Sequence, residues 1–342
     1  MTMTTCMPKI SIVCAWYNRA DHLDRTVGSL LAQEYPNFDV TIVNDGSTDP
    51  RVRHILDGYA DPRIRIFHTG NAGFVGAIRL AINASDSELI AIQGAGDISG
   101  PHRLKVQADH LMADPDCIGV SCMIRNVHVG GDRDGAIVPQ ERPAGRIDSA
   151  LFAADGPNPM SHGEVTYRRS AYEKAGGYRD VFRFAQDRDL WLRLIDHGHF
   201  HRVDGYHYDR MIFAEDGISA NLMKTVSQMK LSHMARQNAR IRARFGADLV
   251  DVFADQATLY ANRTSAVANY MASAALHCML CGMEKEARLY MMLALQEKWT
   301  PRSLAVCALV RGNYALFGGR LNPLISAIVP KIDRTPARIF RS

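Results

Sequence analysis

The chain has 342 residues, 47% of them hydrophobic and 22% charged, so it can bury a full core and has the composition of an ordinary globular protein. A net charge of +4 is too small to indicate nucleic-acid binding. No run approaches the ~20 apolar residues of a membrane span, and the opening MTMTTCMPKI lacks the apolar core of a signal peptide, so we expect a cytoplasmic protein.

Strands and helices alternate over residues 8–115. Short apolar runs predict strands, and apolar residues at helical spacing predict helices. The expected strands cover residues 10–13, 40–43, 64–68 and 89–93, and the expected helices cover residues 19–33, 51–58 and 76–83. This alternation predicts an α/β fold whose mostly parallel central sheet carries helices on both faces.

The pattern is less regular beyond residue 115. Further strands are expected at 119–126 and 164–168, further helices at 170–175 and 187–197, and a Gly-, Asp- and Pro-rich loop or lid at 127–160. After about residue 220 the chain is rich in Ala, Met and Leu at helical spacing, with no strand signal. We therefore expect one α/β domain over residues 1–225 and a helical C-terminal region over residues 226–342.

The cysteines indicate reduced thiols. Seven of them, an odd number, are scattered through apolar stretches, which argues against a disulfide framework. Cys278 and Cys281 form a CxxC, but no second pair completes a zinc site, so we expect buried thiols on a helix.

The last residues, 320–342, carry the whole net charge of the chain. They contain five basic residues against Asp333, which sums to +4, and apolar residues are interleaved with them. Such a basic amphipathic tail could bind an anionic membrane surface and make the protein peripheral to the inner face of a membrane. A tail helix packed on its own domain, with solvated arginines, would explain the same pattern.

Polar residues follow three of the expected strands. Ala15-Trp16-Tyr17-Asn18 follows the first, Asn44-Asp45-Gly46-Ser47 the second, and Gly94-Ala95-Gly96-Asp97 the strand at 89–93. In a parallel sheet these loops share one edge, where open α/β sheets bind ligands. Trp16 or Tyr17 could lie against a nucleobase, Asp45 could accept from its N–H, and Asp97 could hold a divalent cation. Taken singly, the same residues are turn formers or helix caps.

A fourth segment, Phe184-Ala185-Gln186-Asp187-Arg188-Asp189-Leu190-Trp191, begins the expected helix at 187–197. Asp187 is either a helix cap or a general base that deprotonates a hydroxyl. His162 is either a residue on the acceptor or diphosphate side of a site or a packed loop histidine.

Together these segments resemble the family 2 glycosyltransferases. The resemblance covers residues 8–225 and rests on blocks in the family's order and spacing. The blocks are Ala15-Trp16-Tyr17-Asn18, Ser29-Leu30-Leu31-Ala32-Gln33, Tyr35-Pro36-Asn37, Asn44-Asp45-Gly46-Ser47-Thr48-Asp49, Asn71-Ala72-Gly73, Gly76-Ala77, Arg168-Arg169-Ser170, Gly176-Gly177-Tyr178 and Asp187-Arg188-Asp189-Leu190-Trp191.

The resemblance implies a GT-A fold and an inverting sugar transfer. It assigns Asp45 to the nucleobase, Asp97 to a metal ion (Mg²⁺ or Mn²⁺) and the diphosphate, and Asp187 to the role of catalytic base. The donor implied is a nucleotide-diphosphate sugar, for which the resemblance favours a UDP-linked one. The acceptor implied is a hydroxyl of a glycan or lipid-linked acceptor in cell-surface polysaccharide synthesis. The implied donor-binding residues are Ala15, Trp16, Tyr17, Asn18, Asp45, Asn71, Arg79, Gly96 and Asp97, and the implied acceptor-side residues are His162, Gln186 and Trp191.

The chain departs from the family pattern at three places. Gly94-Ala95-Gly96-Asp97 stands where the family has Asp-x-Asp-Asp, so metal binding is in doubt. Gln186 replaces a Glu beside the base, and Ile78-Arg79 stands where Arg-Asn is usual, so Arg79 either reaches a phosphate or faces solvent. These departures leave open a catalytically weak nucleotide-sugar-binding module. A nucleotidyltransferase is a more distant alternative, because Ala15-Trp16-Tyr17-Asn18 is not a Gly-rich phosphate loop.

Overall fold

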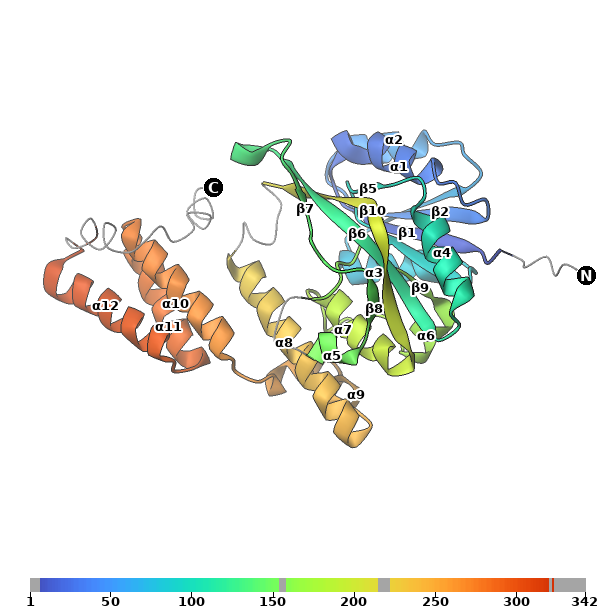
Figure 1. Cartoon of the computed structure of the whole chain (residues 1–342). Helices are drawn as coiled ribbons and strands as arrows, with labels where there is room; N and C mark the ends of the chain where they lie inside the picture. The colour runs from blue at the N-terminus through green and yellow to red at the C-terminus, as the bar shows by residue number, and fades with distance from the viewer. Residues whose placement is uncertain (1–6, 154–157, 215–221, 320–321, 323–342) are drawn as a thin grey trace, which may run out of the picture. The chain divides into compact units, whose positions relative to one another are not determined.

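The computed structural model describes residues 7–153, 158–214, 222–319 and 322, and the chain divides into two compact units, Met1–Phe213 and Ala214–Ser342. Within the described residues, every strand belongs to the first unit and the second unit is helical (Figure 1).

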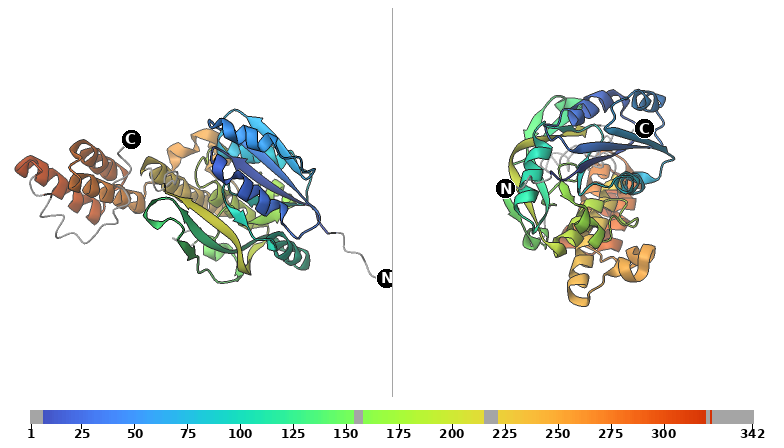
Figure 2. Two further views of the ribbon diagram at one scale, coloured as in Figure 1. Left: turned by 90° about the horizontal axis from the view of Figure 1, so that it is seen from above. Right: turned by 90° about the vertical axis from the view of Figure 1, so that its right-hand side faces the viewer.

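The first unit is built on a ten-stranded sheet with the strand order β3-β2-β1-β4-β9-β6-β10-β5, in which β7 also pairs with β6 and β8 with β10. Figure 2 shows the twist of this sheet in two further views. The strands are β1 Ile10–Trp16, β2 Phe38–Asp45, β3 Ile64–Thr69, β4 Leu89–Gln93, β5 Ile98–Ser99, β6 Cys117–Val129, β7 Ile137–Pro139, β8 Gly145–Ile147, β9 Thr166–Arg168 and β10 His199–Phe213.

The first four strands confirm the predicted parallel core. β1 pairs in parallel with β2 and β4, and β2 pairs in parallel with β3. β9 is antiparallel to both β4 and β6, whereas β10 runs parallel to β6. The fold is therefore the predicted mostly parallel α/β arrangement, with an antiparallel strand inserted at its centre.

Helices cover both faces of the sheet. α1, α2 and α4 form one apolar cluster with residues of β1, β2 and β4, among them Ile10, Ile12 and Cys14. α3 contacts β1 and β2 but contributes nothing to that cluster, and successive strand residues face opposite sides, so α3 covers the other face. The helices of the first unit are η1 Ala20–His22, α1 Leu23–Leu31, α2 Pro50–Asp57, α3 Gly73–Asn83, α4 Arg103–Ala113, η2 Gly131–Arg133, α5 Ser149–Ala153, α6 Arg169–Lys174, α7 Gln186–Leu194 and η3 Ile195–His197.

Two stretches differ from the sequence-based prediction. The predicted loop at 127–160 contains the end of β6, the short strands β7 and β8 and the helix α5. The predictions also included no strand at 199–213, where the structure has the long strand β10. β10 mixes His, Tyr, Arg and Asp with its apolar residues, and its register against β6 shifts within 203–208, so it shows no clean apolar alternation.

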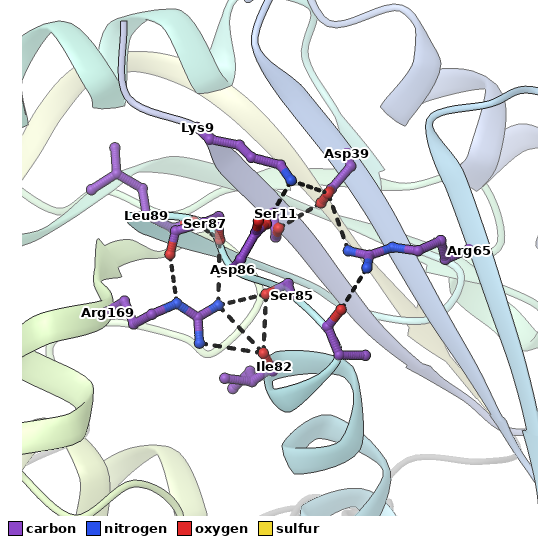
Figure 3. A network of polar contacts seen from close by, with 11 residues as sticks. Lys9, Ser11, Asp39, Arg65, Ile82, Ser85, Asp86, Ser87, Leu89 and Arg169 are labelled. Atoms are coloured by element: carbon purple, nitrogen blue, oxygen red, sulfur yellow. Dashed lines mark hydrogen bonds and ion pairs between the residues drawn. The ribbon is translucent and has the colours of Figure 1, made fainter. Parts of the chain in front are cut away.

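Ion pairs join the strands at their amino ends, the edge of the sheet opposite the three candidate loops (Figure 3). Asp39 of β2 lies 3.0 Å from Lys9 Nζ and 3.1 Å from Arg65 Nη2, and it accepts a hydrogen bond from the Ser11 hydroxyl. Arg169, which follows β9, donates to main-chain and side-chain oxygens of residues 82–87 before β4. We call this edge the amino edge; its contacts lie within the first unit and hold the strand starts together.

The second unit consists of helices α8 Leu222–Phe245, α9 Leu249–Phe253, η5 Ala254–Tyr260, α10 Ser265–Leu280, α11 Glu284–Glu297 and α12 Pro301–Phe317. α10 and α11 form a helical hairpin, which turns at Gly282 with φ +76°. Cys278 is buried as predicted, whereas Cys281 ends α10 and is exposed. The predicted basic tail lies outside the described residues, Asn322 excepted. Across the described ranges, the helices all fall short of the length and apolar character that crossing a membrane requires.

Candidate functional site

The loops after β1 and β2 lie in contact at the carboxyl edge of the sheet. Asn18 holds them together: its Oδ1 accepts from the N–H of Thr48 at 2.9 Å and of Asp49 at 3.2 Å, and its own N–H donates to Ser47 Oγ at 2.8 Å. Asn18 adopts φ +55°, a conformation that asparagine tolerates better than most residues. The predicted meeting of these two loops is confirmed, and Asn18 acts as the joint between them.

Of the two aromatic residues in the first loop, only Tyr17 is accessible. Trp16 is fully buried, belongs to the core cluster of the sheet and donates from Nε1 to the Asn18 carbonyl. Tyr17 is 44% exposed, and Ala15 between Cys14 and Trp16 is half-buried. A base could therefore stack on Tyr17, whereas the placement of Trp16 against a ligand is not supported because its ring is part of the core.

Asp45 fixes the loop before α3. Its Oδ1 accepts from the Ala72 N–H at 2.6 Å, and the carboxyl group is buried. The loops approach so closely that a Cβ on Gly46, which has φ +67°, would lie 2.5 Å from Asn71 N. Asn71 itself is exposed and accepts from the Gly73 N–H. The structure thus brings Asp45 and Asn71 together, as predicted for residues of one binding site.

A pocket of 460 Å³ adjoins this contact. It is lined by residues 71–76 at the start of α3 and by Asp180 and Arg183. Arg79, one turn further along α3, has its Nη1 2.9 Å from both carboxylate oxygens of Asp180. Arg79 is therefore not a free solvent-facing residue but pairs with Asp180, a residue that lines the pocket.

Asp97 turns inward. Its Oδ2 accepts from the Tyr208 hydroxyl at 2.7 Å and its Oδ1 from the Met211 N–H at 2.8 Å, and only 8% of the residue is exposed. Burial raises the pKa of Asp97, an effect that the hydrogen bonds from Tyr208 and Met211 oppose. Both oxygens are thus already engaged by neutral donors of β10.

The residues around Asp97 do not fit a metal site. Hard divalent cations need several oxygen ligands, yet both Asp97 oxygens have protein partners. In the described part of the chain, no group of three or more His, Cys, Asp or Glu side chains is placed to hold a metal ion. Gly96, predicted beside it, has φ +92° and lies against the Phe213 ring.

Tyr208 and Gly163 are residues of this site that the sequence analysis missed. The Tyr208 hydroxyl accepts from the Gly94 N–H at 2.9 Å while donating to Asp97, so it ties the loop after β4 to β10. A Cβ on Gly163 would lie 2.1 Å from that hydroxyl. The only signal was the polar and aromatic character of residues 199–213, because the partners lie 111 residues apart in the chain.

Asp187 occupies the first turn of α7 beside the segment that follows residue 157. Its Oδ2 accepts from Asn158 Nδ2 at 3.0 Å and its Oδ1 from the Arg188 N–H at 2.8 Å. Ala185 precedes the helix with φ +55° while 1% exposed, a strained conformation for alanine that the surrounding packing must impose. Gln186 begins α7 and is half-buried. Asp187 is therefore held at a helix start, half-buried, by an amide donor that the sequence analysis did not identify.

His162, which the resemblance assigns to the acceptor side, contacts a residue of the pocket. Its Nε2 lies 2.5 Å from Tyr178 Oη, and its ring contacts Phe74, a pocket residue, with centroids 5.0 Å apart. Burial lowers the pKa of His162 to about 4, and the nearby Asp187 carboxylate opposes that shift. Trp191 is fully buried beneath this ring at 6.0 Å, so it supports His162 from the core rather than lining a surface.

Comparison with known proteins points to one family. A family profile described as "Glycosyl transferase family 2" matches residues 11–176. The chain is 30% identical over 198 residues to the "Putative glycosyltransferase EpsE" of Bacillus subtilis (strain 168), covering 56% of this chain and 68% of EpsE. It is 25% identical over 222 residues to the "Chondroitin synthase" of Pasteurella multocida (strain Pm70), covering 63% of this chain and 22% of that protein.

The crystal structures of TarS 1–349 from S. aureus share the fold. One superposes with a TM-score of 0.52 and 15% identity over 90% of this chain and 91% of that one, and a second, with similar agreement, is a complex with UDP. At this identity the likeness concerns the fold alone.

Proposed function

This chain belongs to glycosyl transferase family 2, and we propose that it moves a sugar from a nucleotide-diphosphate sugar, UDP-linked, to a hydroxyl of a glycan or lipid-linked acceptor, with inversion at the anomeric carbon. The acceptor would be consumed in cell-surface polysaccharide synthesis.

One observation carries the proposal: a residue that lines the pocket beside Asp45 is in ring contact with His162, on the proposed acceptor side. Phe74 lines the pocket and contacts the His162 ring. The charge of the Asp187 carboxylate in turn acts on the pKa of His162. A donor whose base lies near Asp45 and Tyr17 would thus have its sugar within reach of a carboxylate that can take a proton.

Asp187 is suited to the role of general base. It is partly accessible, and its orientation is fixed by Asn158 and by its own helix start. When the acceptor hydroxyl attacks the anomeric carbon, its proton passes to an Asp187 oxygen. The bond from that carbon to the diphosphate oxygen breaks, and the nucleoside diphosphate leaves with the electron pair. A single displacement inverts the configuration, and a placed base contributes ~10²–10⁴-fold.

His162 supports this step as a neutral group. A histidine whose pKa is about 4 is uncharged at pH 7, so it does not form an ion pair that would hold the Asp187 carboxylate away from a substrate proton.

The choice of UDP and of a glycan acceptor has narrower support. A protein of the same fold, TarS, is crystallised with UDP, and one relative is named a chondroitin synthase. Since those likenesses are distant or partial, UDP is the first nucleotide to test rather than a deduction from the pocket.

The proposal is tested by a donor screen followed by turnover. Thermal shift with UDP-, GDP- and dTDP-sugars selects the donor, and release of the nucleoside diphosphate then measures hydrolysis or transfer. We expect stabilisation by one nucleotide class and measurable turnover. A protein that binds a donor but releases no nucleotide with any glycan or lipid acceptor would instead be a binding module, and one that binds none contradicts the assignment of the site.

We further propose that residues 320–342 bring the enzyme to an anionic membrane that carries its acceptor. The support is the sequence: five basic residues with interleaved apolar ones, each basic residue being worth ~1 kcal/mol near such a surface. Co-sedimentation with anionic vesicles should fall when the tail is removed or salt is raised. Equal partitioning of full-length and truncated proteins would refute a membrane role for the tail.

A further inference from the structure

Arg19 lies across the loop where the family's acidic motif is reduced to one aspartate. It follows Asn18 at the carboxyl end of β1 with φ +59°, and its Nη1 donates to the Ala95 carbonyl at 2.6 Å. Its guanidinium carbon lies 4.2 Å from the centroid of the Phe213 ring. A carbonyl oxygen and an aromatic face therefore fix this cation beside the loop at 94–97.

The same loop has no room for the carboxylates it lacks. A Cβ on Gly94 would lie 2.2 Å from Asp97 Oδ2, and a Cβ on Gly96 would lie 2.9 Å from Phe213 Cζ. Any side chain at either position would collide with a neighbour that is itself buried or ring-packed. Glycines at 94 and 96 are thus required by the packing of this loop. A second carboxylate ligand for a metal could not be introduced there without rearranging the loop.

From this juxtaposition we propose that the transfer needs no divalent cation and that Arg19 supplies the positive charge facing the diphosphate. The inference rests on the proposed function, since the diphosphate is that of the donor. Arginine suits the task because its planar, permanently charged fork can donate two parallel hydrogen bonds to phosphate oxygens. The guanidinium would offset the charge that grows on the leaving diphosphate as the bond to the anomeric carbon breaks.

The charge of Arg19 acts on this loop in the structure as it stands. The guanidinium groups of Arg210 and Arg19 both favour the ionised form of Asp97 and so oppose the effect of burial on its pKa. Arg79, the other cation considered from the sequence, lies at Asp180, which lines the pocket. Arg19 lies at the loop 94–97 itself, through the Ala95 carbonyl, and is therefore the cation that we assign to a diphosphate at this loop.

Calorimetry of UDP and of uridine, each in excess chelator and in Mn²⁺, tests the proposal on the full chain. We expect UDP affinity to change less than about three-fold between chelator and Mn²⁺. Arg19→Gln, which keeps an amide donor for the Ala95 carbonyl but removes the charge, should weaken UDP binding at least about ten-fold and leave uridine binding unchanged. Arg19→Lys should recover part of the loss, and Arg25→Ala, on an exposed residue of α1, should change neither ligand.

The outcomes separate the inference from the function beneath it. Turnover that survives excess chelator and falls in Arg19→Gln supports the proposal. Turnover abolished by chelator and restored by Mn²⁺, or UDP affinity unchanged in Arg19→Gln, overturns the role of Arg19 and leaves the glycosyltransferase assignment standing. Failure of the wild type to bind any nucleoside diphosphate or to turn over any donor removes the proposed function, and with it this inference.

Discussion

The two edges of the central sheet hold their aspartates in opposite ways. At the amino edge, Asp39 lies between the cations of Lys9 and Arg65, which neutralise it within the protein (Figure 3). At the carboxyl edge, Asp97 is held by the hydroxyl of Tyr208 and a backbone N–H, both neutral donors. The residue type is the same, but one carboxylate is part of a structural ion-pair network, whereas the other is hydrogen-bonded to neutral donors within a tightly packed loop.

The difference teaches where to expect stability effects and where to expect catalytic ones. Asp39 is paired with cations of the protein itself, so its carboxylate is not available to a ligand. Substituting it should therefore lower the stability of the fold and leave ligand binding unchanged. Residues at the carboxyl edge and on the acceptor side that adjoins it should affect ligand binding or turnover, whether or not they also affect folding. Four substitutions test this division.

The largest effect is expected on the acceptor side. Asp187→Asn keeps the shape and one acceptor oxygen but cannot take a proton, so turnover should fall ~10²–10⁴-fold while donor affinity stays within a few-fold. Nucleotide release under saturating donor measures it. Asp109→Asn, on an exposed residue of α4, is the matched control and should be indistinguishable from wild type. Retention of more than about a tenth of wild-type turnover would remove Asp187 from the role of base.

The next effect is expected where the acceptor-side segment passes Asp97. In Gly163→Ala the new methyl group would lie 2.1 Å from Tyr208 Oη, so the hydroxyl must move away from Asp97. We expect a loss of ~1–3 kcal/mol in the free energy of unfolding, together with weaker UDP binding. Urea denaturation gives the first quantity and calorimetry the second.

Gly28→Ala is the control for that glycine. Gly28 lies in α1 with nothing within 4 Å of an added Cβ, so alanine should leave stability unchanged or raise it by ~0.5–1 kcal/mol. If the two variants are equally stable, the Tyr208 side chain can move away from residue 163 without a measurable loss of stability, which would contradict the prediction.

Much of this site could be predicted because its residues are local in sequence. Asn18 lies two residues after β1, Asp45 ends β2 and Asp187 lies in the first turn of α7. Parallel pairing alone brings the first two to one edge. The alternation of side chains along β1 would also have predicted the burial of Trp16. Ile10, Ile12 and Cys14 face one core cluster, and the next residue in that alternation is Trp16, which belongs to the same cluster.

The contacts of Asp97 could not be predicted in this way. They come from β10, which is more than a hundred residues away along the chain and is inserted beside β6 and β5 with register shifts. No local pattern specifies which residue of such a strand meets which loop. The inward turn of the Asp97 carboxylate, and with it the poor fit to a metal, therefore required the structure.

A pH-dependent effect on stability is expected at His162. Burial holds its pKa near 4 in the folded protein, against about 6.5 when unfolded, so between these values the unfolded state binds more protons. Above about pH 6.5 the imidazole is neutral in both states, so burying it does not lower the free energy of unfolding. As pH falls toward 4, the unfolded state gains a proton that the folded state does not bind, and the free energy of unfolding decreases. Urea unfolding at about pH 7 and pH 5 should show wild type losing ~1–2 kcal/mol more than His162→Gln on acidification. If wild type and His162→Gln lose the same free energy of unfolding on acidification, the His162 ring is protonated as readily in the folded state as in the unfolded state.

The smallest effect is expected at the amino edge, and it concerns stability alone. Asp39→Asn removes the carboxylate that faces Lys9 and Arg65, cations that are each more than a third exposed and therefore partly screened by solvent. We expect a loss of about 1 kcal/mol in unfolding free energy, reduced at high salt, with turnover unchanged. Asp86→Asn, whose side chain is 85% exposed and faces the same lysine, should cost less stability than Asp39→Asn. A drop in turnover in Asp39→Asn at unchanged stability would contradict the division between the two edges, because it would mean that the ion-pair network at the strand starts controls the geometry of loops at the other end of the same strands.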